Sequence, residues 1–178
     1  MQRTVFKWEA GGVLFTILMG SLLHFAFEFS GRTPWVGAFA AVNESVWEHL
    51  KLTFWPTLLW ALFEFARLRH ATHNFWWAKA LALYIMPLFI TVCFFIYTSF
   101  TGHAVLPLDI TIFALAVALG QFASYRVLTG NVKAAWLNWL GLMLILALGA
   151  AYAAFTYLPP HVGIFREEFS GRYGISGS

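Results

Sequence analysis

The chain has 178 residues, of which 60% are hydrophobic and only 11% are charged, with a formal net charge of +3. Soluble domains carry roughly a quarter of charged residues, so this composition excludes an ordinary soluble domain. The length corresponds to a single domain over residues 1–178, and the few basic residues lie at segment ends, which argues against a nucleic-acid surface.

Long apolar segments dominate the sequence, and they are continuously apolar rather than alternating, which favours helices over the strands of a membrane barrel. About 20 such residues suffice to cross a bilayer. We therefore expect an all-α, polytopic bundle of transmembrane helices in the cell membrane, with membrane lipid as its partner. Turn-forming and polar stretches separate five predicted spans, over residues 11–29, 45–65, 75–100, 107–125 and 134–157.

Two features of the N-terminal third need interpretation. The first predicted span follows Arg3 and Lys7, as a signal peptide would, but no small-residue cleavage site follows it, so we expect it to remain in place. Residues 35–42 are apolar but too short to cross a membrane, and they form either a re-entrant piece or an early start to the second helix.

The distribution of lysine and arginine predicts the orientation. Lysine and arginine are more frequent before the first span, between the second and third spans, and between the fourth and fifth spans than in the other connecting segments. Because basic residues favour the inner side of a membrane, we expect the N-terminus inside and the C-terminal tail outside. The tail, residues 158–178, combines turn formers with the aromatic residues Phe165, Phe169 and Tyr173, and we expect it to fold over the outer face.

Ionisable residues gather at the predicted outer end of the first two spans. His24 and Glu28 are four residues apart, so they share one face at the end of the first helix. Glu44, Glu48 and His49 lie at the start of the second helix, in a decapeptide that also contains a lysine. Charged groups at the edge of a membrane are costly and mark a functional site by default.

The chemistry of these groups points to a divalent metal, with zinc as the first choice, held by His24, Glu28, Glu48 and His49. Such a metal could activate a water molecule, with Glu44, Glu48 and His49 as catalytic residues, for a hydrolase or transferase acting on a lipid or another membrane-embedded substrate. No strict metal-binding signature is present.

Two other interpretations stay open. A proton- or cation-coupled small transporter could use the same groups, although five helices are few for a carrier and would require a homo-oligomer. Alternatively the protein is a non-catalytic membrane subunit whose charges cap helices, since Ser45 to Glu48 matches a capping box. The concentration of polar residues on one side favours a site over a transport path. On the inner side, we expect Glu64 to pair with Arg67, three residues on.

Two segments together resemble a known family. The residues Asn43 to Lys51 (NESVWEHLK) and the tail from Pro159-Pro160 to Gly171-x-Tyr173-Gly174-Ile175 are similar to those of an uncharacterised family of small bacterial integral membrane proteins, known as a domain of unknown function. The resemblance spans most of the chain and implies no activity. It does imply that the decapeptide and the tail belong to one unit.

Overall fold

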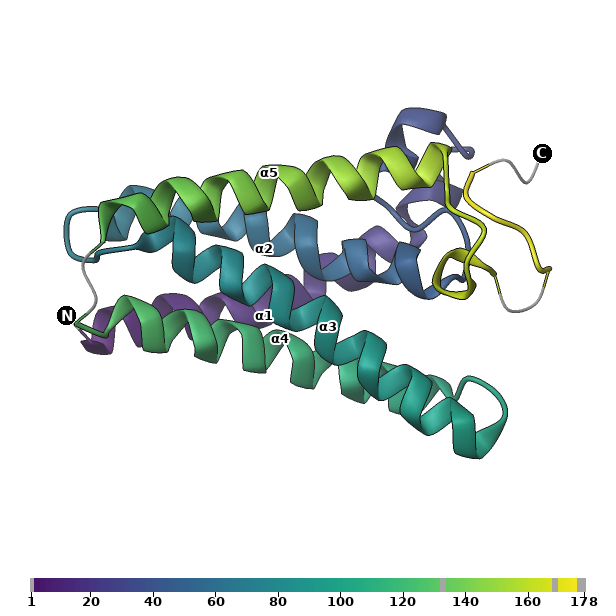
Figure 1. Ribbon diagram of the computed structural model, residues 1–178, viewed down its shortest axis with the longest axis horizontal. Coiled ribbons are helices and arrows are strands. Elements are labelled where there is room, and N and C mark those ends of the chain that lie inside the picture. Colours follow the sequence, from purple (N-terminus) through teal and green to yellow (C-terminus); the bar gives the residue numbers. More distant parts are fainter. Residues whose placement is uncertain (1, 132–133, 168–169, 176–178) are drawn as a thin grey trace.

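Five long helices form an elongated bundle in the computed structural model, which describes residues 2–131, 134–167 and 170–175 (Figure 1). The helices are α1 (Gln2–Phe29), α2 (Val46–Leu68), α3 (Phe75–Thr101), α4 (Leu106–Leu128) and α5 (Ala135–Tyr157), with two short 3₁₀ helices, η1 (Pro34–Ala38) and η2 (Gly163–Phe165). No strand occurs among the described residues, so the predicted all-α class is confirmed. The start of α1 and the C-terminal tail lie at opposite ends of the bundle (Figure 1).

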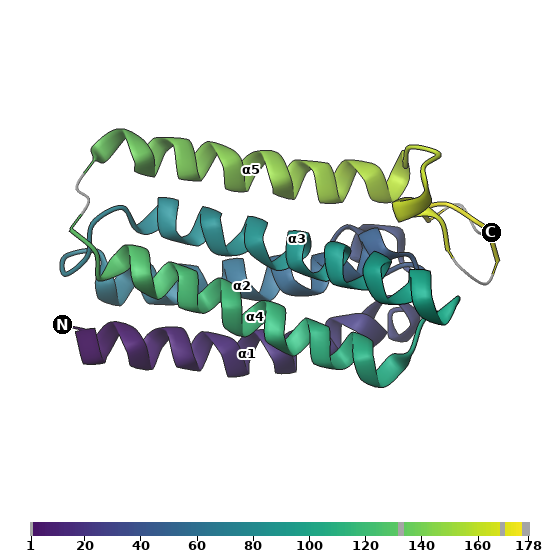
Figure 2. The same ribbon diagram turned by 60° about the horizontal axis from the view of Figure 1, so that its bottom comes forward.

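Four of the helices, α1, α3, α4 and α5, are long and apolar enough to cross a membrane. The helix α2 has similar length but carries the charged residues Glu48, Lys51 and Glu64, all of which are buried. It contacts α1, α3 and α5, while Leu59, Leu62 and Phe63 leave one apolar face of α2 exposed (Figure 2). The buried charged residues of α2 therefore face other parts of the protein, while the apolar surfaces of the other helices face outward.

Glycines allow two of these helix pairs to approach closely, as small residues do in membrane proteins. A Cβ atom on Gly20 of α1 would lie 2.6 Å from the carbonyl oxygen of Leu52 in α2. On Gly141 of α5 it would lie 2.5 Å from the carbonyl oxygen of Trp76 in α3. Any larger residue at these positions must push the backbones apart.

The segment between α1 and α2 is a separate element rather than an early start to the second helix. It forms η1 and a turn, and α2 begins only at Val46, after Ser45 accepts a 3.4 Å hydrogen bond from the backbone of Glu48. Two long side chains hold η1 in place: Trp55 Nε1 donates to the Ala38 carbonyl at 3.1 Å, and the Tyr157 hydroxyl donates to the Pro34 carbonyl at 2.9 Å. The element therefore caps one end of the bundle.

The tail packs against the same end. Phe165 of η2 is 7% exposed, and its ring centroid lies 4.7 Å from that of Trp47 in α2. Tyr173 packs edge-on against His161 at 4.8 Å, and the backbone of Ile175 donates a 2.9 Å hydrogen bond to the Thr156 carbonyl. Phe169, the remaining predicted aromatic anchor, lies outside the described residues. The tail and η1 together form a cap on this end of the bundle, which we call the outer cap after the predicted orientation and define as residues 34–42, 158–167 and 170–175.

Candidate metal site

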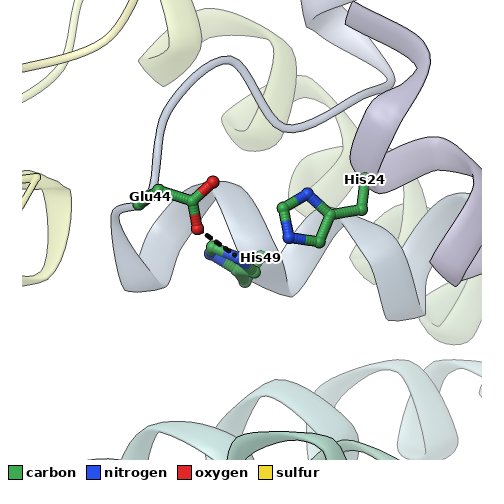
Figure 3. A group of neighbouring side chains, drawn as sticks. All are labelled: His24, Glu44 and His49. Atoms are coloured by element: carbon green, nitrogen blue, oxygen red, sulfur yellow. Dashed lines mark ion pairs between the residues drawn. The ribbon is translucent and has the colours of Figure 1, made fainter. Parts of the chain in front are cut away.

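Three of the predicted residues converge beside the outer cap (Figure 3). His24 comes from α1, Glu44 from the loop before α2, and His49 from the first turns of α2. One ligand atom from each lies within 4.8 Å of the other two. The His24 and His49 ring centroids are 5.0 Å apart with the planes at 83°, and His49 Nε2 lies 3.3 Å from Glu44 Oε2.

The ring of His49 is oriented by the backbone of α2. Its Nδ1 atom lies 2.9 Å from the carbonyl oxygen of Ser45, which can only accept, so Nδ1 carries a proton. The Nε2 atom faces the carboxylate of Glu44. In a neutral His49 this atom carries a lone pair, which can bind a second proton or a cation. A backbone carbonyl that fixes the distal nitrogen in this way is the usual arrangement around a metal-binding histidine.

The electrostatics of Glu44 favour its charged form. A hydrogen bond from the His49 side chain is the main cause that lowers the pKa of the Glu44 carboxyl, and the charges of His49 and His24 act in the same direction, against the effect of partial burial. The Glu44 side chain is 49% exposed and that of His49 is 32% exposed. The cluster thus combines one carboxylate with two imidazoles at a place that solvent can reach.

The structure places Glu48 in a buried network instead of beside His24, Glu44 and His49. Its Oε2 atom lies 2.5 Å from Lys51 Nζ and accepts a 3.0 Å hydrogen bond from the backbone of Val42, while Oε1 accepts a 3.1 Å hydrogen bond from Thr156. With both oxygens occupied and 1% of the residue exposed, Glu48 lies outside the His24/Glu44/His49 cluster. The physical reason is local, because the first turn of α2 points Glu48 toward the interior and the outer cap.

Lys51 completes this buried network. Its Nζ atom donates to the carbonyl oxygen of Gly37 in η1 at 2.6 Å and to Thr156 Oγ1 in α5 at 2.8 Å. The charge-bearing residues of α2 therefore hold the outer cap and α5 in place around the site. They position the start of α2, from which Glu44 and His49 extend.

Glu28, the other predicted ligand, also lies apart from the cluster. It sits one turn beyond His24 and forms an exposed ion pair with Arg32 at 3.3 Å, with 64% of its side chain exposed. Although His24 and Glu28 share a helical face, α1 ends at Phe29, and Glu28 reaches the residues that follow the helix. The ligand set that geometry supports is therefore His24, Glu44 and His49.

A second charged cluster lies near the other end of the bundle, where the sequence analysis placed none. Lys79 of α3 contacts Glu9 of α1 at 2.8 Å and Glu64 of α2 at 2.5 Å. Ser124 of α4 donates a 2.6 Å hydrogen bond to Glu9. The expected pair of Glu64 with Arg67 is wrong, because Glu64 turns into the bundle whereas Arg67 is exposed.

These features define a helical protein with membrane-compatible helices and a His/Glu cluster at one end. The chain belongs to a family of unknown function, DUF6512, whose family model matches residues 1–175. The predicted resemblance to an uncharacterised family is thereby confirmed. No curated protein and no solved structure gave a significant match.

Proposed function

We propose that this protein is an integral membrane protein that binds a divalent metal ion, zinc in the first instance, through His24, Glu44 and His49. The observation that carries the proposal is the convergence of two imidazoles and one carboxylate, with ligand atoms within 4.8 Å of one another. Two histidines and a glutamate are the ligand set of one class of catalytic zinc site.

Such a site has three protein ligands, which leaves a coordination position open. A metal ion bound there would supply a water molecule activated for attack on a carbonyl or phosphoryl centre. The chain's own contribution is positional, since the Ser45 carbonyl fixes the ring of His49 and the Glu48–Lys51 pair fixes the start of α2. The partial exposure of the cluster at the end of apolar helices favours a substrate carried by lipid. The proposed activity is therefore a metal-assisted hydrolase or transferase at the membrane surface.

We place the site on the extracytoplasmic side of the cell membrane, with α2 as a fifth span. The opposite placement of the two ends of the chain supports an odd number of spans, and the distribution of basic residues supports an inner N-terminus (Figure 1). A reporter that is active only in the cytoplasm should be inactive when fused to the C-terminus and active when fused to the N-terminus. Activity at the C-terminus would reverse the orientation.

Metal analysis of the purified full-length protein tests the binding proposal. Wild-type protein that has been dialysed against zinc should retain a stoichiometric amount of zinc. The His24→Ala and His49→Ala variants should each lose the bound zinc. His103→Ala is the matched control, because His103 is exposed in the α3–α4 loop and should leave the zinc content unchanged. Wild-type protein free of metal, or equal metal in all variants, would remove the site.

A separate measurement tests the proposed hydrolase or transferase activity. Zinc-loaded protein in mixed micelles should release the acyl chain or headgroup from a fluorescent phospholipid, and the His49→Ala variant should not. Zinc binding without turnover of any lipid ester would keep the metal site and remove the hydrolase. The two results are therefore distinguishable.

A further inference from the structure

The charged cluster near the inner end of the bundle brings together four helices. Glu9, Glu64 and Lys79 are 3%, 0% and 0% exposed, and Ser124, which donates to Glu9, is also fully buried. Each of α1, α2, α3 and α4 contributes one of these residues. In a span that faces lipid, ionisable groups at this depth are costly and require compensation.

The charge of this cluster does not balance. Two carboxylates share one ammonium group, since Glu9 Oε1 and Glu64 Oε2 both contact the same Lys79 Nζ atom. With all three groups ionised, one negative charge remains buried, which is strongly unfavourable in a medium of low dielectric. Two carboxyl groups in one site relieve such an imbalance by retaining a proton.

We propose that Glu9 and Glu64 share one proton, so that the Glu9–Glu64–Lys79 cluster is a buried proton-binding site that is neutral when occupied. Glu9 Oε1 and Glu64 Oε2 lie 2.8 and 2.5 Å from the same Lys79 Nζ atom, so the two carboxyl groups are close enough to compete for one proton. Because both carboxyl groups contact one ammonium group, the proton belongs to the pair rather than to either residue.

Unpartnered polar atoms mark the same place. Glu9 Oε2 and Glu64 Oε1 are buried and have no hydrogen-bond partner among the described residues, and neither do Nε2 and Oε1 of Gln121. Gln121 is 1% exposed and precedes Ser124 by one turn on the same face of α4. Its Nε2 atom would lie 2.5 Å from a Cβ on Gly12, one turn along α1 from Glu9. Buried polar groups are nearly always paired, so these atoms point to a ligand that forms hydrogen bonds.

No other described charge faces the cluster from the surrounding helices. α3 contributes only Lys79, and α5 contains no charged residue. The remaining charged residues near this end of α1, α2 and α4 are all exposed: Arg3, Lys7, Arg67, Arg69 and Arg126. An apolar layer that includes Phe75, Leu68 and Leu128 packs nearby, together with the partly buried Tyr125. Phe75 contacts the cluster directly, since Lys79 Nζ lies 5.4 Å from the centroid of its ring.

Infrared spectroscopy of the full-length protein in lipid vesicles tests this site. At neutral pH the wild type should show one carbonyl band of a protonated carboxylic acid, which shifts in D₂O and disappears at alkaline pH. Glu9→Gln and Glu64→Gln should each abolish it, because the remaining carboxylate is balanced by Lys79. Lys79→Met should double it, because both acids then need a proton. Glu28→Gln, which alters an exposed ion pair, should leave it unchanged.

Three outcomes would overturn the proposal. The first is a wild-type spectrum without this band at neutral pH, and the second is a band that survives in both glutamine variants. The third is a band that appears only in sodium-free buffer, since sodium would then be the ligand that balances the charge. The wild-type measurements in D₂O and across pH need no variant, so the proposal remains testable even if one substitution prevents folding.

Discussion

The side-chain amide of Asn43 donates a 3.0 Å hydrogen bond to the carbonyl oxygen of Gly174, which lies 131 positions later in the chain. The next residue, Ile175, bonds through its backbone to Thr156 of α5, whose hydroxyl in turn bonds to Glu48. The start of α2, the end of α5 and the tail are thus one hydrogen-bonded unit. The resemblance between this chain and its family implied this unit, and the contacts show how it forms.

Replacing Asn43 with alanine should loosen the tail without unfolding the helices. The lost hydrogen bond contributes about 1 kcal/mol to stability, and the Gly174 carbonyl loses its partner. Hydrogen exchange should become faster at Ile175, and limited proteolysis should cut the tail sooner. Asn131→Ala, at an exposed loop position, is the control. Equal protection of Ile175 in both variants would contradict the role of Asn43.

Replacing Lys51 with methionine should destabilise the whole bundle. The change leaves the carboxylate of Glu48 buried and without its cation, which costs about 3–5 kcal/mol. Thermal and denaturant unfolding in detergent should show a lower midpoint, whereas Lys7→Met, at an exposed residue, should not. The double variant Glu48→Gln/Lys51→Met should recover part of the loss. A double variant less stable than Lys51→Met alone would mean that the ion pair does not act as a unit.

Acid should weaken the contribution of Glu44 to stability. Because the folded-state pKa of Glu44 is lowered below its ordinary value of 4.5, the contribution is fully present above pH 4.5. It is lost as the pH falls through the lower, folded-state pKa. In metal-free buffer, the difference in melting temperature between wild type and Glu44→Gln should be constant from pH 4.5 to about 6, where an imidazole still carries the proton that it donates to Glu44, and should shrink below pH 4.5. Glu28→Gln serves as the comparison. A difference that grows on acidification would contradict the pairing with His49.

Replacing Gly141 with alanine should separate α5 from α3. The new Cβ would meet the backbone of Trp76 at 2.5 Å, a contact that neither helix can relieve by moving a side chain. Overpacking of this kind costs about 1–3 kcal/mol. Gly163→Ala is the matched control, because a Cβ there meets nothing within 4 Å. Similar melting temperatures for both variants would show that the helix pair tolerates a wider spacing.

The apolar runs predicted the helices well, because burial in lipid or protein requires continuous hydrophobic segments. The convergence of His24 with Glu44 and His49 also followed from sequence, because the ends of successive helices return to one side of the bundle. The separation of Glu48 from these three residues could not be predicted from sequence. The capping motif at Ser45 shows that Glu48 lies in the first turn, but not that Thr156 and Lys51 occupy its oxygens.

The inner cluster was missed for two physical reasons. Glu9 lies before the predicted first span, which began at residue 11, whereas α1 begins at Gln2 and carries Glu9 inside the bundle. Glu64 has a basic residue three positions later, so local spacing favoured Arg67 over a partner on another helix. The packing of α3 against α2 brings Lys79, rather than Arg67, to Glu64. A contact between two helices cannot be predicted from the residue spacing within one of them.

The reach of Lys51 constrains how the protein is assembled during synthesis. Its ammonium group binds η1 and also Thr156 of α5, a helix that is synthesised well after α2. Until α5 packs against α2, the ion pair of Glu48 and Lys51 lacks one of its buried partners. A chain truncated before α5 should therefore be retained by the insertion machinery or degraded. The surroundings of the charged residues in α2 are therefore complete only after α5 has been made and has packed against them.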